Sequence, residues 1–161
     1  MPEKTRILLV LKTSPGPGVY LIDTDVLSEV RKGHRAHAGV LAFFQRLSNE
    51  DILVYLSVVT LGELRRGVET IRHRGDSAQA EMLDKWLSNV LKHYADRILP
   101  LDEDIAQVWG RLRVPNHENA LDKQIAATAL VHNLVLATRN VQHFRGLGLE
   151  LFNPFEQTGD P

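Results

Sequence analysis

Short apolar segments alternate with longer helical segments along this chain, and this alternation restricts its fold more than any other feature. Segments rich in β-branched and aromatic residues, as buried strands are, cover residues 19–23, 51–57, 97–101, 134–138 and 149–152. Helical patterning fills the intervals between them. Strands separated by helices usually pair in parallel, with helices on both faces of the sheet. The sequence therefore predicts an α/β protein with a central, mainly parallel sheet of four or five strands.

Four helices are predicted at 60–74, 76–95, 102–113 and 120–133, with shorter helical stretches after the first strand and again at 38–47. A length of 161 residues suits one domain, which we expect to span 19–156. Residues 1–18 are expected to form a leader, and 157–161 a tail.

The apolar run in the leader is shorter than the about 7–15 residues of a secretory core or the about 20 of a spanning helix. We therefore expect no membrane association, and a cytoplasmic location by default. The chain has no cysteine, which excludes disulfides and thiolate metal sites. Its net charge of −1 does not by itself indicate a nucleic-acid-binding protein.

Polar side chains follow several of the predicted strands. Asp23 comes directly after the first strand, Glu63 opens the helix after the second, and Asn140 follows the fourth. Asp122 begins the helix that leads into the fourth strand. Ligands of parallel α/β sheets bind outside the carboxyl ends of the strands. These four residues are therefore candidates for one common site.

Each carboxylate also has a purely structural interpretation. Asp23 can bond the start of the helix that follows it, although we favour a functional role from its position at a strand end. Thr60 and Glu63 match a capping box, in which the glutamate bonds back to the cap residue. Asn119 can cap the next helix and leave Asp122 as a favourable first-turn acid. Taken alone, Glu63 and Asp122 are better explained as structural residues.

The expected proximity of these carboxylates favours a functional interpretation over the structural ones. Carboxylates from three separate segments, Asp23, Glu63 and Asp122, are expected at one edge of one sheet, where they repel one another unless they share a cation. Oxygen ligands of this kind suit Mg²⁺ or Mn²⁺. None of the seven histidines has a zinc-type spacing, so they are interpreted as surface and packing residues.

A phosphoaspartate mechanism is the rival interpretation of the first motif. The stretch "LIDTDVL" resembles the opening of haloacid-dehalogenase-type phosphatases, in which the first aspartate attacks phosphorus and the second handles the proton. Ser57 or Thr60 could serve as the next required residue, but no lysine or late acidic pair follows at a strand end. The phosphatase reading explains one motif, whereas a metal site explains three.

Four segments of the chain resemble the PIN-domain ribonucleases and, among them, the VapC toxins of type II toxin–antitoxin modules. They are "YLIDTDVLSEVRKG", "LSVVTLGELRRGVE", "DKQIAATALVHNLVLATRNVQHF" and "LFNPF", in the order that this family has them. The resemblance implies a three-layer α/β/α fold, and a magnesium-dependent ribonuclease with Mn²⁺ as an alternative ion.

Site residues follow from the resemblance position by position. It makes Asp23 and Asp122 metal ligands and Glu63 a third acidic member. Asn140 stands at the fourth position, where many members have aspartate, and Asp25 stands where asparagine is common. His143 lies in a segment that can also supply an acid. Asp25 is a candidate for supplying the missing charge, from its proximity to Asp23.

The implied reaction is metal-assisted hydrolysis of an RNA phosphodiester. An acidic pocket repels phosphate, so basic neighbours are needed. Arg65, Arg66, Lys123 and Arg139 are candidates for phosphate contacts, with a solvated helix face as the alternative for each. Asn140 also leaves open a catalytically weak protein that works by binding RNA or an antitoxin.

Partners follow from the resemblance alone: a VapB-like antitoxin that holds the enzyme inactive, and a second copy in a homodimer. The sequence offers one compatible feature, an apolar stripe on the helix at 76–95. Such a stripe belongs more often to a core than to an interface. It consists of Met82, Leu83, Trp86, Leu87, Val90 and Leu91.

Overall fold

The computed structural model describes residues 18–156, and the expected leader (to residue 17) and tail lie outside the described residues. Five strands form one sheet in which every pairing is parallel. Their order across the sheet is β3-β2-β1-β4-β5. The strands are β1 (Tyr20–Ile22), β2 (Val54–Ser57), β3 (Ile98–Leu99), β4 (Val135–Ala137) and β5 (Leu151–Phe152). The predicted parallel sheet is confirmed.

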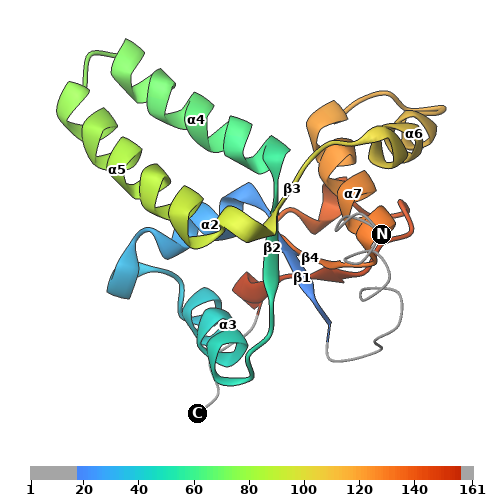
Figure 1. The fold of residues 1–161 in the computed structure, drawn as a ribbon, viewed down its shortest axis with the longest axis horizontal. Coiled ribbons are helices and arrows are strands. Elements are labelled where there is room, and N and C mark those ends of the chain that lie inside the picture. The colour runs from blue at the N-terminus through green and yellow to red at the C-terminus, as the bar shows by residue number, and fades with distance from the viewer. Residues whose placement is uncertain (1–17, 157–161) are drawn as a thin grey trace.

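Helices cover both faces of this sheet, and one helical hairpin extends beyond it (Figure 1). They are α2 (Thr24–Val30), α3 (Ala38–Asn49), α4 (Val58–His73), α5 (Ser77–His93), α6 (Glu103–Leu112) and α7 (Ala120–His132). Short 3-10 turns include η1 (Gly33–Arg35), η3 (Val141–His143) and η4 (Pro154–Glu156). Within the described residues, no helix combines the length and apolar character needed to cross a membrane.

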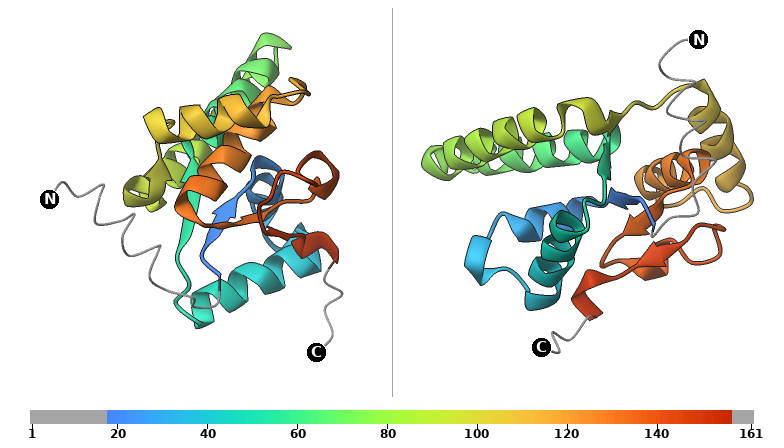
Figure 2. Two further views of the ribbon diagram at one scale, coloured as in Figure 1. Left: turned by 90° about the vertical axis from the view of Figure 1, so that its right-hand side faces the viewer. Right: turned by 60° about the horizontal axis from the view of Figure 1, so that its bottom comes forward.

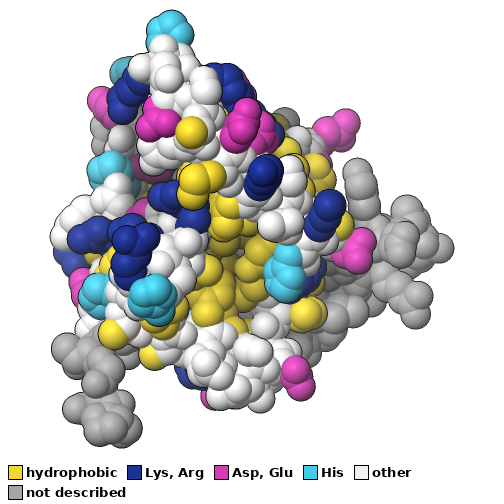
Figure 3. Space-filling model, turned by 90° about the vertical axis from the view of Figure 1, so that its left-hand side faces the viewer, with side chains coloured by type: hydrophobic (Ala, Val, Ile, Leu, Met, Phe, Trp, Pro, Cys, Tyr) yellow, Lys and Arg dark blue, Asp and Glu magenta, His cyan; other side chains and the backbone are white. Residues whose placement is uncertain are grey.

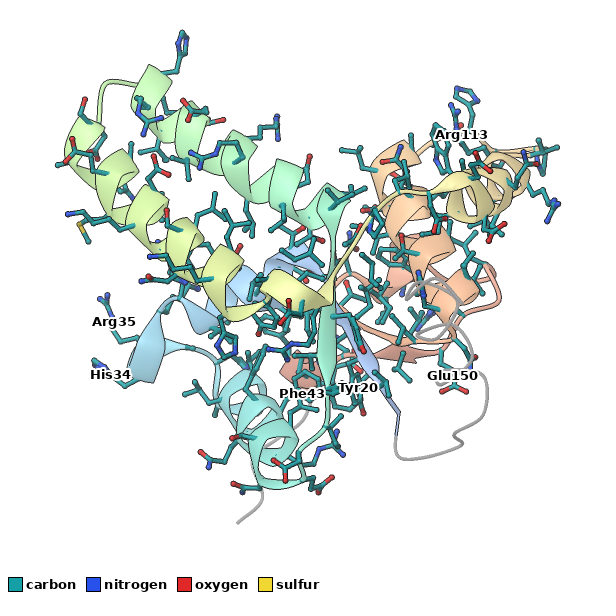
Figure 4. All side chains as sticks on the ribbon, viewed as in Figure 1. Tyr20, His34, Arg35, Phe43, Arg113 and Glu150 are labelled. Atoms are coloured by element: carbon teal, nitrogen blue, oxygen red, sulfur yellow. The ribbon has the colours of Figure 1, made fainter. Side chains whose placement is uncertain are left out.

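Alternation along β1 divides the interior into two cores. Tyr20 and Ile22 face one core with α2, α3, α4 and α5, whereas Leu21 faces the other, which is lined by α7 and by Phe144. Both faces are covered, so the strand reads as a continuous apolar run rather than an alternating one. Tyr20 packs edge-on against Phe43 in the first core, with ring centroids 5.0 Å apart, and the two residues lie side by side in Figure 4. Figure 2 shows the resulting layers from two further sides.

Chain direction reverses across the sheet beside β1. From β1 the chain moves outward through β2 to β3, and α6 and α7 then carry it back past β1 to β4 on the other side. The carboxyl ends of β1 and β4 therefore flank a topological switch point, where open α/β sheets bind their ligands. Ile22 pairs with Ala137 in register, so Asp23 and Thr138 emerge side by side.

Two predicted boundaries are wrong for identifiable reasons. The second strand begins at Val54 rather than at residue 51, because α3 continues to Asn49 and Asp51 takes a left-handed turn with φ 51°. Helix α4 begins directly after β2, because the Ser57 hydroxyl accepts a hydrogen bond from the backbone N–H of Val59 at 3.1 Å. Serine is a favoured cap, so the helix starts there.

The apolar stripe on α5 is mainly core, as predicted. Leu87 and Val90 are buried, and Leu83 and Trp86 pack against the same core. Met82, which is 71% exposed, and Leu91 face outward.

Candidate active site

Asp23 lies at the carboxyl end of β1 and is almost completely buried, with 7% of its surface exposed. Its Oδ1 accepts a hydrogen bond from the backbone N–H of Thr24 at 2.8 Å, which caps α2. Its Oδ2 accepts one from the Thr138 hydroxyl at 2.7 Å. Asp23 therefore caps α2, and it also faces the residue that follows β4 at the edge of the sheet.

Asp23 is held in an environment that opposes its charge. Burial raises the pKa of this carboxyl from 3.8 to about 6, and the nearby Asp25 carboxylate acts in the same direction. The hydrogen bonds from Thr138 and Thr24 lower it, and Asp122 adds a smaller increase. A cation beside these carboxylates would remove the conflict.

Asp25, in the first turn of α2, joins the same group. Its Oδ2 accepts a hydrogen bond from the backbone N–H of Arg139 at 3.1 Å, and its Oδ1 is buried without a partner among the described residues. Burial raises the pKa of Asp25, and Asp122 contributes to the increase. A buried carboxylate oxygen that has no hydrogen-bond donor is a suitable ligand for a hard cation.

Asp122, in the first turn of α7, approaches from the third segment. Its Oδ2 lies 2.7 Å from Nδ1 of His143, and the same nitrogen lies 2.7 Å from the side-chain amide of Asn140. Asn119 is the N-cap residue of α7, but its side chain makes no capping hydrogen bond. The carboxylate of Asp122 therefore faces the segment after β4.

Glu63 is half-buried on α4, and its predicted capping box does not exist. Ser57 caps the helix instead, while Thr60 is fully buried inside it and its hydroxyl has no partner within residues 18–156. Glu63 is thus free of the structural role that competed with a functional one. Helix α4 packs against α2 and α7, but the described contacts do not include Glu63 in the hydrogen-bonded group.

A divalent ion fits the chemistry of this group. The donor set is built from carboxylate oxygens, one of them buried without a partner, and Asp25 and Asp122 both raise the pKa of Asp23. Across residues 18–156, however, no three His, Cys, Asp or Glu side chains are already close enough together to hold a metal ion. Ligation would therefore require side-chain movement on binding.

The four basic candidates divide into two classes. Lys123 is buried and its ammonium donates to the backbone carbonyl of Asn116, so its predicted phosphate contact is abandoned. Arg65 is turned toward α5, where it pairs with Asp84 at 3.0 Å. Its predicted phosphate contact is abandoned as well. Arg66 is exposed, and Arg139 is exposed with its guanidinium 4.8 Å above the ring of Phe155. Only these two remain candidates.

Thr138 is a participant that the sequence did not identify, and the contact of His143 with Asp122 was not predicted either. Thr138 is fully buried and joins Asp23 through its hydroxyl. The signal for it was the in-register pairing of β1 with β4, which places the residues after both strands next to each other. His143 was interpreted with the other histidines as a surface or packing residue, and the resemblance placed it only in a segment that can supply an acid. No spacing rule connects it with Asp122.

Comparison with known proteins agrees with this architecture. The sequence pattern described as PIN domain matches residues 20–147. The chain is 36% identical over 143 residues to a protein named Toxin FitB from Neisseria gonorrhoeae, covering 85% of this chain and 99% of that one. It is 31% identical over 143 residues to VapC ribonuclease Y4jK from Sinorhizobium fredii, covering 86% and 99%.

Solved structures give the same answer. A crystal structure described as FitAcB from Neisseria gonorrhoeae superposes with a TM-score of 0.75 at 34% identity, covering 86% of this chain and 100% of that chain. A structure described as FitAB bound to a DNA fragment superposes with a TM-score of 0.73 at 32% identity, covering 89% and 100%. The phosphatase interpretation finds no support in these relatives. The chain belongs to the PIN-domain family and is a VapC-like member of it.

Proposed function

We propose that this protein is a divalent-metal-dependent endoribonuclease toxin that hydrolyses RNA phosphodiester bonds and uses Mg²⁺, with Mn²⁺ as a substitute. One observation carries the proposal. In a chain of the PIN-domain family, Asp23, Asp25 and Asp122 lie near the carboxyl ends of β1 and β4, close enough for Asp25 and Asp122 to raise the pKa of the buried Asp23, and Oδ1 of Asp25 is buried without a partner among the described residues.

Each residue has a defined part in this proposal. Asp23, Glu63 and Asp122 hold the ion, and the unpartnered Oδ1 of Asp25 supplies the charge that Asn140 lacks. When bound, the divalent ion would polarise the phosphoryl group and promote ionisation of a water molecule. Thr138 keeps the Asp23 carboxylate oriented through its hydroxyl.

Substrate binding requires positive charge beside these acids. Arg139 lies directly after Thr138 and presents its backbone N–H to Asp25, while its guanidinium remains at the surface. Arg66 is the second exposed candidate. Both would bind the RNA backbone, so affinity should fall with increasing salt.

A catalytically weak, binding function is the second candidate. Two observations favour it: Asn140 replaces a charged residue of the family pattern, and the acidic side chains in residues 18–156 are not preassembled for a metal ion. In this case the protein would bind RNA or an antitoxin with little turnover.

Purified protein with Mg²⁺, incubated with structured RNAs, tests the proposal. The controls are Asp23→Asn and Asp84→Asn, which change a buried site carboxylate and a partly exposed carboxylate on α5. We expect cleavage by the unchanged protein and by Asp84→Asn, and none by Asp23→Asn. Cleavage by all three would indicate a contaminating nuclease, and cleavage by none would favour the binding function.

An antitoxin partner is proposed from the FitAB relatives and from the surface. Figure 3 shows hydrophobic side chains gathered in the centre of one face, with charged side chains of both signs and histidines around them. Met82 and Leu91 of α5 are exposed. An exposed apolar patch with a polar rim is typical of a protein-binding surface. Co-expression with the product of a neighbouring short reading frame, followed by co-purification, tests the pairing, and light scattering tests the expected homodimer.

A further inference from the structure

Two short runs of hydrogen bonds, which meet at Asn140, connect Asp23 and Asp122 to the segment that follows β4. The Thr138 hydroxyl donates to Asp23 Oδ2 at 2.7 Å and accepts from the backbone N–H of Asn140 at 3.0 Å. The side-chain amide of Asn140 lies 2.7 Å from His143 Nδ1, which lies 2.7 Å from Asp122 Oδ2. The two carboxylates are therefore linked through one short piece of chain.

The partners of His143 determine where its proton lies. An ionised carboxylate can only accept, so Nδ1 must carry a hydrogen and donate it to Asp122 Oδ2. In the structure the amide nitrogen of Asn140 faces Nδ1, which would set two donors against each other. The oxygen and nitrogen of an amide are assigned from the hydrogen-bond network, so we assign the oxygen to this position, where it accepts from Nδ1–H. Asp122 and Asn140 then share one ring donor, and Nε2 takes no part in these hydrogen bonds.

The ring of His143 is held in place from both sides in the sequence. The next residue, Phe144, is 1% exposed and packs in the second core, which fixes the end of η3. Asn140, at the start of η3, contacts the ring itself. The side chain of His143 is 43% exposed, so an unsupported pair with Asp122 would contribute little to stability. The contacts of Phe144 and Asn140 therefore fix the orientation of the His143 ring more than they add to the stability of the fold.

We propose that His143 is a positioning residue for Asp122: its Nδ1–H holds Oδ2 of the carboxylate and leaves Oδ1 available for the divalent ion. This inference rests on the proposed function, because it assumes that Asp122 is a ligand. Groups that orient a metal ligand from behind typically affect metal affinity about 10- to 100-fold. At the fourth position of the family pattern, Asn140 has an amide where many members have a carboxylate. Together with the imidazole of His143, this amide would fix the orientation of the Asp122 carboxylate instead.

Two substitutions separate the two ring nitrogens. His143→Asn keeps a donor at the position of Nδ1, and His143→Gln keeps one near the position of Nε2. Mn²⁺ is titrated into the full chain in a calorimeter, with no RNA present. We expect His143→Asn to bind Mn²⁺ nearly as the unchanged protein does, and His143→Gln to bind it about 10- to 100-fold more weakly.

The matched control is His34→Gln, because His34 is exposed in η1 and points away from the body of the molecule (Figure 4). It should leave Mn²⁺ affinity unchanged. The double variant Asp122→Asn with His143→Gln should bind no more weakly than Asp122→Asn alone, since the effect of His143 passes through Asp122. Thermal melting of each variant confirms folding.

Several results would overturn the inference. Equal affinity in all His143 variants would show that the ring does not position a ligand. Retained affinity in His143→Gln with loss in His143→Asn would assign the effect to Nε2. Failure of the unchanged protein to bind Mn²⁺ would reject the proposed function itself, together with this inference, and it would be seen before any variant is compared.

Discussion

The α4–α5 hairpin and the carboxyl ends of β1 and β4 organise their charges in opposite ways. In the hairpin, Arg65 and Arg72 each pair with both Glu69 and Asp84, so exposed charges of both signs alternate at distances of 2.5–3.4 Å. At the strand ends, Asp23, Asp25 and Asp122 place like charges together, with Asp23 buried.

The hydrogen bonds lower the pKa values of Glu69 and Asp84 below their ordinary values, because their arginine partners favour the charged forms. At the strand ends, the pKa of Asp23 is raised instead. In the hairpin, each of these charged side chains is paired with side chains of opposite charge from the same chain. At the strand ends, burial and neighbouring carboxylates oppose the charge of Asp23. A site that is stabilised by an added cation differs in this way from a surface that needs none.

Asp23→Asn is expected to have the largest effect. Removing this carboxylate should lower RNA cleavage by about 100-fold or more and abolish measurable Mn²⁺ binding at the site. The same change should stabilise the metal-free protein at pH 8, by up to about 3 kcal/mol, because it removes a charge that burial opposes. Cleavage rates, calorimetry and chemical denaturation measure these outcomes. A less stable Asp23→Asn protein would contradict the electrostatic comparison.

The pH dependence of stability should differ between the unchanged protein and Asp23→Asn. The folded-state pKa of Asp23 is raised from 3.8 to about 6, so the folded protein retains a proton that the unfolded chain has lost. The contribution of Asp23 to stability is therefore complete below pH 3.8 and is lost as the pH rises through about 6. Denaturation midpoints between pH 4 and pH 8 should fall more steeply in the unchanged protein.

Divalent ions should offset this loss at high pH. At a concentration about 100 times the dissociation constant, Mg²⁺ or Mn²⁺ should add roughly 2.7 kcal/mol at pH 8 and much less at pH 5, where Asp23 is protonated. Melting curves with and without the ion measure the difference. An equal shift at both pH values would place ion binding outside the Asp23 group.

Arg139→Gln and Arg65→Gln compare one arginine from each region. We expect Arg139→Gln to weaken RNA binding and to reduce the dependence of log Kd on log salt concentration by about one. Arg65→Gln should leave both quantities unchanged, because its guanidinium is paired within the hairpin. Binding isotherms at several salt concentrations test the pair. Equal effects of the two substitutions would show that Arg65 also contacts the RNA phosphates.

Asp84→Asn should have the smallest effect. Asp84 pairs with Arg65 and Arg72 at the surface, and exposed ion pairs contribute little to stability. We expect the melting temperature and RNA cleavage to remain close to those of the unchanged protein. A large loss of stability would show that the hairpin depends on its charges rather than on Leu87 and Val90.

The strands and most of the helices were predictable from the sequence, because burial and periodicity act over a few neighbouring residues. The segments at 134–138 and 120–133 correspond to β4 and α7 within a few residues. Local rules failed at Thr60, where a matching capping box was less favourable than the serine that ends β2. The apparent structural role of Glu63 disappeared with it.

The candidate site was predictable only in part. Sequence order identified Asp23 and Asp122 as strand-end and helix-start acids, and the structure brings them together, whereas Lys123 is buried beside Asp122 and bonded to the backbone. The roles of Thr138 and His143 depend on the register of β1 against β4 and on the burial of Phe144.

From the sequence alone came the alternation of strand and helix, the parallel sheet and the acidic residues at strand ends, because each depends on the spacing of side chains along the chain. Only the tertiary structure decided which groups face those acids. Hydrogen bonds such as that between His143 and Asp122 join residues that are distant in sequence, and no local pattern specifies their approach.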